Sequence, residues 1–211
     1  MRFERILFDV SGTLWDDLDQ VFIANYNVLM DGGYHCFPET DEPLSIEGLK
    51  SRAVGSCVEM FRSFGMKGSD EELTEKYVCA LDEVASKYPV KLYDGVDTLI
   101  QSLDGKVPKI VISAHPQHRL EEDLDKVGIY DEFEKIIGNC HHKCDTIQKN
   151  VKNITPYVGD TKGDIIHARN AGAVPLAVTY GYGKLDDILK ENPHKHFNCA
   201  FTLRDYLLER V

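Results

Sequence analysis

The stretch that decides the fold is residues 6–14, Ile6-Leu7-Phe8-Asp9-Val10-Ser11-Gly12-Thr13-Leu14. Its apolar start is continuous rather than alternating, which is typical of a strand buried on both faces of a parallel sheet. Such a strand ends at the edge where open α/β sheets bind ligands, and we expect Asp9 to project there. Gly12 permits a tight turn directly after the strand. The stretch therefore predicts a site at the carboxyl end of this strand.

The turn after Asp9 combines a carboxylate with main-chain N–H groups. We expect the N–H groups of Ser11, Gly12 and Thr13 to face an anion. A carboxylate beside a phosphoryl group is repelled unless a cation lies between them, so the pattern implies a divalent metal ion. With that ion bound, Asp9 can attack phosphorus and form an aspartyl-phosphate. A buried strand followed by a helix-capping residue would explain the same residues. The rest of the sequence is needed to distinguish this alternative from a phosphate site.

Length, charge and cysteine content limit the classes of function. The 211 residues suffice for one α/β domain with a modest insertion. A net charge of −11 argues against nucleic acid or an anionic membrane as partner, because both attract basic surfaces. Arg2, Glu4 and Arg5 interrupt the amino-terminal apolar run, so we expect neither a signal peptide nor a membrane span. The six cysteines include no Cys-x-x-Cys pair, and free thiols in a cytoplasmic protein are the simplest interpretation.

The pattern of strands and helices predicts an α/β fold. Apolar runs over residues 109–113, 135–138, 154–158 and 174–179 are expected strands, each separated from the next by a turn or helix. A last short strand is expected at residues 199–201, before a helix over residues 203–210. This alternation is typical of a Rossmann-like parallel sheet with helices on both faces.

Residues 44–89 show helical patterns and no strand pattern. We expect helices over residues 44–54, 57–64 and 71–87. Because this block lies between the first strand and the next strand–helix unit, we expect a small all-helical domain of residues 15–89 inserted into a core of residues 1–14 and 90–211. A helical insertion at this point can close over the edge of a sheet and exclude water.

Residues 9–14 resemble the first motif of the haloacid dehalogenase-like (HAD) superfamily, which usually has the pattern Asp-x-Asp-Gly-Thr. The resemblance implies that Asp9 is the nucleophile and a metal ligand, and that the main-chain carbonyl of Ser11 is a second ligand. It also implies that the helical insertion is the family's cap domain. The chain departs from the motif at Ser11, where the family has its second aspartate.

Two further segments resemble the second and third motifs of this superfamily. Ser113, at the end of an apolar run, is similar to the hydroxyl residue that donates to a phosphate oxygen, although Ala114 stands where asparagine is usual. Taken alone, Ser113 would be a helix cap. Lys143 resembles the lysine that neutralises the phosphate and the nucleophile together. Lys135 and Lys149 compete with Lys143 for this role.

The segment Tyr157-Val158-Gly159-Asp160-Thr161-Lys162-Gly163-Asp164 resembles the fourth motif, Gly-Asp-x-x-x-Asp after an apolar strand. The resemblance implies that Asp160 binds the metal ion and that Asp164 holds a metal-bound water or orients the lysine. All-oxygen ligands beside a phosphate favour Mg²⁺. Residues 94–96 and 178–183 are similar to the phosphoglycolate-phosphatase-like branch. Together the motifs imply a Mg²⁺-dependent phosphatase acting on a small phosphorylated metabolite.

Ser11 leaves the expected chemistry with three interpretations. In the family, the second aspartate protonates the leaving oxygen and then activates water, which a serine hydroxyl cannot do near neutral pH. General acid–base catalysis contributes about 10²- to 10⁴-fold. The first interpretation is a substrate with a good leaving group, which needs little protonation. The second is that Asp16, Asp17, His115 or a cap residue takes the place of the missing acid and base. The third interpretation is a weakly active or non-catalytic phosphate-binding or regulatory protein.

Two other assignments are a haloacid dehalogenase and a zinc site. A haloacid dehalogenase also lacks the second aspartate, but the resemblance would then require tyrosine at position 11 and an arginine soon after it. The first arginine after the motif is Arg52, in the predicted cap, where it can contact the distal part of an anionic substrate or lie on a solvated helix face. Zinc binding by Cys140, His141, His142 and Cys144 has no second cluster to support it.

Overall fold

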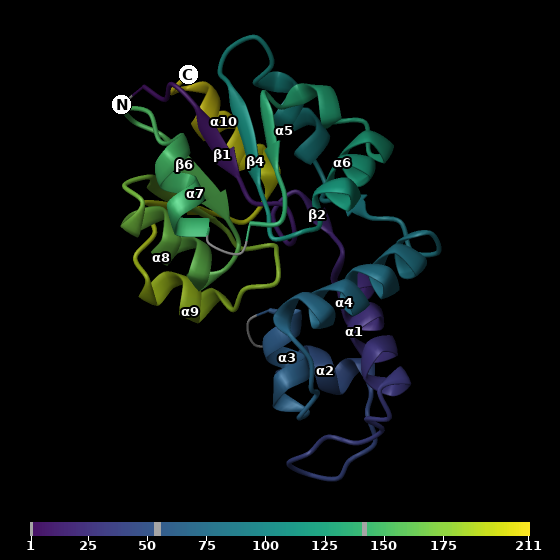
Figure 1. Cartoon of the computed structure of the whole chain (residues 1–211). Coiled ribbons are helices and arrows are strands. Elements are labelled where there is room, and N and C mark those ends of the chain that lie inside the picture. Colours follow the sequence, from purple (N-terminus) through teal and green to yellow (C-terminus); the bar gives the residue numbers. More distant parts are fainter. Residues whose placement is uncertain (1, 53–55, 141–142) are drawn as a thin grey trace. The chain divides into compact units, whose positions relative to one another are not determined.

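The chain divides into two compact units, a core unit of Met1–Asp16 and Val90–Val211 and a helical unit of Asp17–Pro89. The structure is a computed structural model, and it describes residues 2–52, 56–140 and 143–211. Figure 1 shows the path of the chain through the elements of both units. The helical unit is therefore an insertion between residues 16 and 90 of the core unit.

The core unit is built on a six-stranded sheet with the strand order β5-β4-β1-β6-β7-β8. All neighbouring strands of this sheet are parallel, so the predicted α/β class with a Rossmann-like parallel sheet is confirmed. Strand β1 has a hydrogen-bonded neighbour on each side, which explains its continuous apolar sequence. The strands are β1 (Ile6–Phe8), β4 (Lys109–Ile112), β5 (Lys135–Ile137), β6 (Pro156–Gly159), β7 (Val174–Val178) and β8 (Lys195–Phe197).

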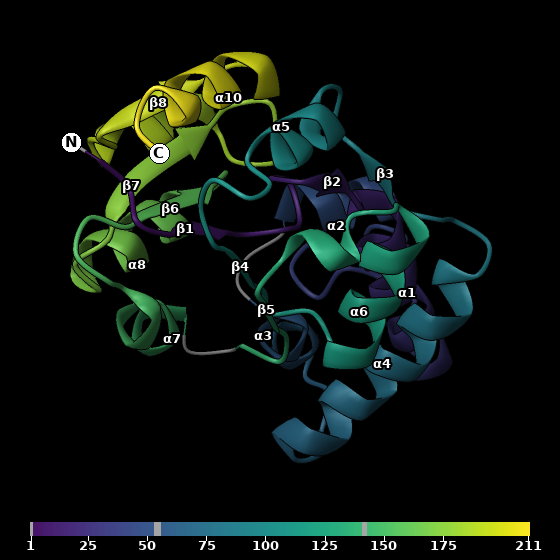
Figure 2. The same cartoon turned by 90° about the horizontal axis from the view of Figure 1, so that it is seen from above.

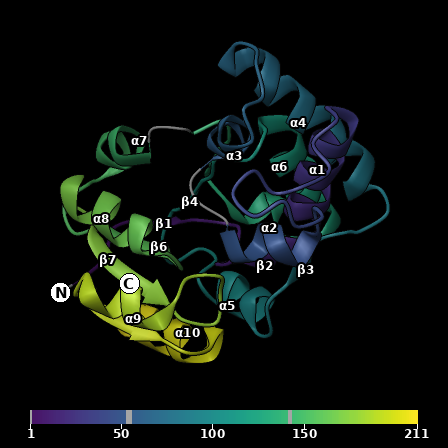
Figure 3. The same ribbon diagram turned by 90° about the horizontal axis from the view of Figure 1, so that it is seen from below.

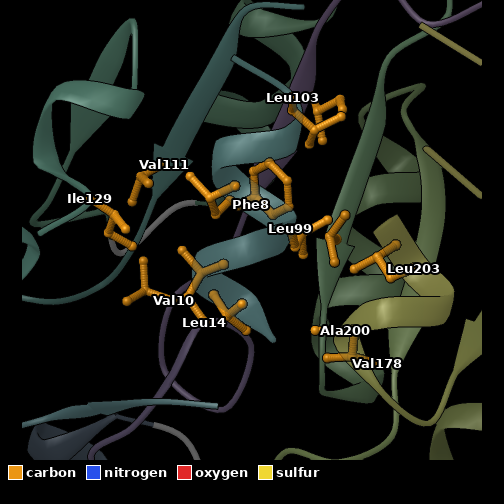
Figure 4. Packing of buried hydrophobic residues seen from close by; sticks show 14 of the residues in the cluster. Phe8, Val10, Leu14, Leu99, Leu103, Val111, Ile129, Val178, Ala200 and Leu203 are labelled. Atoms are coloured by element: carbon orange, nitrogen blue, oxygen red, sulfur yellow. The ribbon is translucent and has the colours of Figure 1, made fainter. Parts of the chain in front are cut away.

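Alternate residues of β1 pack on opposite faces of the sheet, as the pleat of a strand requires. Phe8 lies in the larger apolar cluster, together with Val111 of β4 and Leu99 and Leu203 from two helices (Figure 4). Leu7 belongs to a second cluster on the other face. Both side chains are fully buried, so each face of the central strand is covered by apolar packing.

Helices cover both faces of the sheet (Figure 2). Residues of α5, α6 and α10 contribute to the cluster around Phe8, and residues of α7 and α8 contribute to the cluster around Leu7. Helix α9 packs through Ile188 against Ile165 of α8 and Ala177 of β7. The helices of the core unit are α5 (Val96–Ser102), α6 (Gln117–Lys126), the 3₁₀ turn η1 (Tyr130–Glu132), α7 (Lys143–Asn150), α8 (Lys162–Asn170), α9 (Leu185–Lys190) and α10 (Ala200–Leu208).

The helical unit contains α1 (Leu18–Asp31), α2 (Ile46–Arg52), α3 (Cys57–Ser63) and α4 (Asp70–Ala85). Figure 3 shows these helices from a second direction. The apolar cluster of the helical unit includes the buried side chains of Leu29, Phe61 and Leu73 from α1, α3 and α4. Ser56 and Ser69 each begin a helix with a capping box, which satisfies the first N–H groups of α3 and α4. The predicted role of this unit as a cap stays a prediction.

One local prediction is wrong, and one pair of short strands was not predicted. The last strand is Lys195–Phe197 rather than residues 199–201, and Cys199 instead lies at the start of α10. The sequence also gave no sign of a two-stranded antiparallel ladder between β2 (Trp15–Asp16) and β3 (Lys91–Leu92). Strands of two residues are too short to display the alternation by which a strand is identified.

No helix in the described parts of the chain combines the length and the apolar character needed to cross a bilayer.

We predict that Phe8→Ala lowers the free energy of unfolding by about 3–5 kcal/mol, because the ring is fully buried in the larger cluster and its loss leaves a cavity. Urea unfolding followed by circular dichroism measures the change. The control is Leu189→Ala on α9, whose side chain is 38% exposed and should cost less than about 1 kcal/mol. Equal costs for the two variants would contradict the central position of β1.

Candidate active site

Three neighbouring strands end in polar residues at the same edge of the sheet. Asp9 follows β1, Ser113 follows β4 and Asp160 follows β6. Because β4 and β6 are the parallel neighbours of β1, their carboxyl ends lie beside its own. All three side chains are buried. The edge therefore gathers two acids and a hydroxyl in a place that is shielded from solvent.

Three carboxylates converge at this edge. One oxygen each of Asp9, Asp160 and Asp164 lies within 4.8 Å of the others. Asp164 comes from the first turn of α8, four residues after Asp160, so the start of this helix points its carboxylate back toward the strand ends. The structure thus brings together the acids that the first and fourth motifs supply.

Lys143 lies between two of these acids. Its Nζ atom is 2.9 Å from Oδ1 of Asp9 and 3.0 Å from Oδ1 of Asp164. The lysine belongs to the first turn of α7, and its side chain is 17% exposed. Lys135 and Lys149, the competing candidates, are exposed. The geometry therefore places Lys143, among these three lysines, against the acids.

Asp164 is fixed by a capping box at the start of α8. Thr161 donates to its carboxylate through Oγ1 at 2.6 Å and through the main-chain N–H at 3.0 Å, and the Asp164 N–H donates back to the threonine hydroxyl. The pattern Thr-x-x-Asp was visible in the sequence as a helix start. The Tyr157 hydroxyl also donates to Asp164, at 3.4 Å, and nothing in the sequence indicated this contact.

Two loops donate hydrogen bonds to the Asp160 carboxylate. The Thr13 hydroxyl donates to Oδ1 at 3.3 Å, and the Tyr182 main-chain N–H donates to Oδ2 at 2.7 Å. Gly12 has a φ of +75°, and a Cβ atom there would overlap the carboxylate of Asp160. Glycine at position 12 is thus needed both for the turn and for the close approach of the acid.

Burial raises the pKa of Asp9 to about 6, because the nearby Lys143 only partly offsets the loss of hydration. Burial likewise raises the pKa of Asp160 to about 8, and the charges of Asp164 and Asp9 add to this rise. In Asp164, burial is outweighed by Lys143 and by the hydrogen bonds from Thr161, so its pKa lies below the ordinary value. Burial opposes the charge on Lys143, but the two acids it contacts hold its pKa well above the usual range.

The turn after β1 differs from its predicted use in one respect. The N–H groups of Gly12 and Thr13 donate to the main-chain carbonyls of Trp15 and Val10, at 2.9 and 3.0 Å. Those two groups are therefore engaged within the turn, and the expectation that they face an anion is wrong. Ser11 is half-buried and forms a bridge with Trp15.

The other predicted site residues have varied positions. The Ser113 hydroxyl accepts from the His115 main-chain N–H at 3.2 Å, and Ala114 is exposed. The buried His115 ring packs edge-on against Trp15, with 6.1 Å between ring centroids. Asp16 is exposed and accepts from the Tyr182 hydroxyl at 3.1 Å.

Four residues named in the sequence analysis cannot be placed at the site. Arg52 ends α2, but its side chain lies outside the described part of the structure, as do His141 and His142 of the zinc alternative. Asp17, a suggested stand-in for the missing acid, belongs to the helical unit. Among the described residues, one cluster could hold a metal ion, and it consists of Asp9, Asp160 and Asp164. Cys140 and Cys144 are not part of it.

The profile of the haloacid dehalogenase-like hydrolases matches residues 6–178 of this sequence, a range that includes every acid of the site and Lys143. The chain belongs to the haloacid dehalogenase-like hydrolase family. The family predicted from the four motifs is thereby confirmed.

Relatives of this HAD protein extend over most of its length. A phosphoglycolate phosphatase of Psychrobacter arcticus is 24% identical, covering 99% of this chain and 97% of the relative. An N-acetylmuramic acid 6-phosphate phosphatase of Pseudomonas putida is 25% identical, covering 86% and 85%. A solved structure of a predicted phosphatase from Clostridium acetobutylicum superposes with a TM-score of 0.80 at 20% identity, covering 99% of this chain and 100% of that one. At that identity, the structural similarity establishes the shared fold.

The donor set of this HAD site fits a hard divalent cation. The three clustered side chains offer carboxylate oxygens, which suit Mg²⁺ rather than a soft metal. The raised pKa values of Asp9 and Asp160 show that one lysine does not balance the acids. A bound cation would supply the missing positive charge.

We predict that the metal-free protein loses stability as the pH rises from about 4 to about 8. The folded-state pKa values of Asp9 and Asp160 are raised to about 6 and about 8, so in this window the folded protein holds more protons than the unfolded chain. The free energy of unfolding must then fall with rising pH. Urea unfolding in EDTA at about pH 5 and about pH 8 measures the change.

Asp160→Asn is the matched control, because it removes the acid with the more strongly raised pKa. The variant should show a weaker pH dependence, and added Mg²⁺ should stabilise it less than it stabilises the wild type. A wild-type protein that becomes more stable from pH 5 to pH 8 in EDTA would contradict the assigned shifts.

Proposed function

We propose that the protein is a Mg²⁺-dependent phosphatase that hydrolyses a small phosphorylated metabolite through an aspartyl-phosphate on Asp9. The observation that carries the proposal is the contact of Asp9 with Lys143, at 2.9 Å, within the cluster that also holds Asp160 and Asp164. A buried carboxylate paired with an ammonium group, at the edge where parallel strands end, can accept a phosphoryl group whose charge is balanced locally. The relatives named as phosphatases support the choice of phosphate esters.

The residues have distinct roles in this scheme. A carboxylate oxygen of Asp9 attacks phosphorus, the bond from phosphorus to the ester oxygen breaks, and the leaving group departs with those electrons. Water then attacks the phosphorus of the acyl phosphate, which releases inorganic phosphate and restores Asp9. In this proposal Lys143 offsets negative charge on Asp9 and on the phosphoryl oxygens, and the Ser113 hydroxyl donates to one of those oxygens. Asp164 holds Lys143 in position.

Asp9, Asp160 and the main-chain carbonyl of Ser11 would hold the Mg²⁺ ion. When bound, the ion supplies positive charge between the nucleophile and the phosphoryl group, which would otherwise repel each other. Thr13 and the Tyr182 main-chain N–H keep the Asp160 carboxylate oriented for this task.

Ser11 restricts the substrate in this proposal. A hydroxyl neither protonates a leaving oxygen nor activates water near neutral pH, so a leaving group that departs unprotonated is favoured. Acyl phosphates and aryl phosphates meet this condition. The same observation supports a second candidate function, a protein that binds a phosphorylated ligand and turns it over slowly or not at all.

We predict that Asp9→Asn lowers turnover of p-nitrophenyl phosphate with Mg²⁺ by on the order of a thousandfold or more, because the amide cannot act as the nucleophile. Asp94→Asn, which changes an exposed acid of the same unit, should leave the rate unchanged. EDTA should abolish the wild-type activity. Absence of turnover with every divalent metal, combined with retained phosphate binding, would favour the binding protein instead.

We predict that Ser11→Asp accelerates hydrolysis of alkyl phosphates more than hydrolysis of aryl phosphates. A restored carboxylic acid can protonate the poor alkoxide leaving group, a contribution of about 10²- to 10⁴-fold, whereas a phenolate gains little. The values of kcat/KM for a matched alkyl and aryl pair measure the difference. Equal acceleration of both would count against the leaving-group argument.

A further inference from the structure

The loop after β7 contacts the acid and the turn that follow two other strands. We call residues 179–183, Thr179-Tyr180-Gly181-Tyr182-Gly183, the tyrosine loop. Its Tyr182 N–H donates to Oδ2 of Asp160 at 2.7 Å. Its Tyr180 hydroxyl donates to the main-chain carbonyl of Thr13 at 3.0 Å. One loop thus binds both the end of β6 and the turn after β1.

The Asp160 carboxylate is consequently held on both oxygens. The Thr13 hydroxyl donates to Oδ1 and the tyrosine loop donates to Oδ2. Gly181 makes this packing possible, because a Cβ atom at that position would lie 2.5 Å from Oδ2 of Asp160 and would overlap the Gly12 carbonyl oxygen. Main-chain atoms of the loop therefore lie directly against the carboxylate and the turn.

We infer that Tyr180 is a positioning residue that sets the metal affinity of the site through Asp160. The inference depends on the metal-binding role proposed above for Asp160. The hydroxyl of Tyr180 fixes Thr13, which binds one oxygen of Asp160, and it fixes the loop whose N–H binds the other oxygen. Groups that orient a metal ligand without touching the metal change affinity by about 10- to 100-fold when they are removed.

The surroundings of Tyr180 allow a clean test of its hydroxyl. The ring packs against Tyr93, with 5.0 Å between centroids and an interplanar angle of 58°. Phenylalanine at position 180 keeps this packing and removes only the donor. Tyr182 offers a matched control on the same loop, because its hydroxyl donates to Asp16 and its main-chain N–H, which phenylalanine retains, holds Asp160.

The experiment measures Mn²⁺ binding to the whole protein by electron paramagnetic resonance of the free ion, without substrate. Tyr180→Phe should raise the Kd by about tenfold, and Tyr182→Phe should stay within about twofold of the wild type. With p-nitrophenyl phosphate, excess metal should restore the kcat of Tyr180→Phe while KM for the ester stays unchanged. A role confined to folding would not produce this rescue.

Three outcomes overturn the inference, and the last of them also overturns the proposed metal site. Wild-type binding of Mn²⁺ together with an unchanged Kd in Tyr180→Phe contradicts the role of Tyr180 alone, as do equal losses in Tyr180→Phe and Tyr182→Phe. A wild-type protein that binds no Mn²⁺ contradicts both this role and the proposed metal site. Should Tyr180→Phe fail to fold, Thr13→Val removes the hydrogen bond from the Thr13 hydroxyl to Asp160 and must weaken Mn²⁺ binding by a similar factor.

Discussion

This site depends on two ion pairs of the Lys143 ammonium group, which lies 2.9 Å from Asp9 and 3.0 Å from Asp164. Three carboxylates within 4.8 Å of one another are costly to bury, because low hydration strengthens their mutual repulsion. The lysine contacts two of the acids but carries only one positive charge, and burial together with the charges of Asp164 and Asp9 raises the pKa of Asp160 to about 8. This remaining imbalance makes the site a place where a cation and a phosphoryl group can be held together.

The fold provides this contact through elements that are distant in the sequence. Parallel strands β1 and β6 bring Asp9 and Asp160 to one edge, and the first turns of α7 and α8 add Lys143 and Asp164. Apolar side chains pack on both faces of β1, the strand that leads to this edge. Side chains carried on packed strands and helix starts are positioned more precisely than side chains on loops.

Much of this arrangement could be predicted from the sequence. The continuous apolar run before Asp9 indicated a buried parallel strand, and parallel strands must end together, so the convergence of Asp9 and Asp160 followed from the pattern. The contacts of Tyr182 and of the Gly12 N–H were not predictable, because main-chain donors leave no signature in a sequence. The displaced last strand and the ladder between β2 and β3 were missed because such short strands show no alternation.

The central claim is that Asp9 carries the phosphoryl group during turnover. The most direct test is to quench the protein during reaction with an aryl phosphate and Mg²⁺, reduce it with borohydride and analyse its peptides by mass spectrometry. An aspartyl-phosphate is an activated acyl group, which borohydride reduces to the alcohol, so the account predicts homoserine at position 9. Rapid hydrolysis of the ester with aspartate at position 9 unmodified, and the phosphoryl group trapped on another residue, would contradict it.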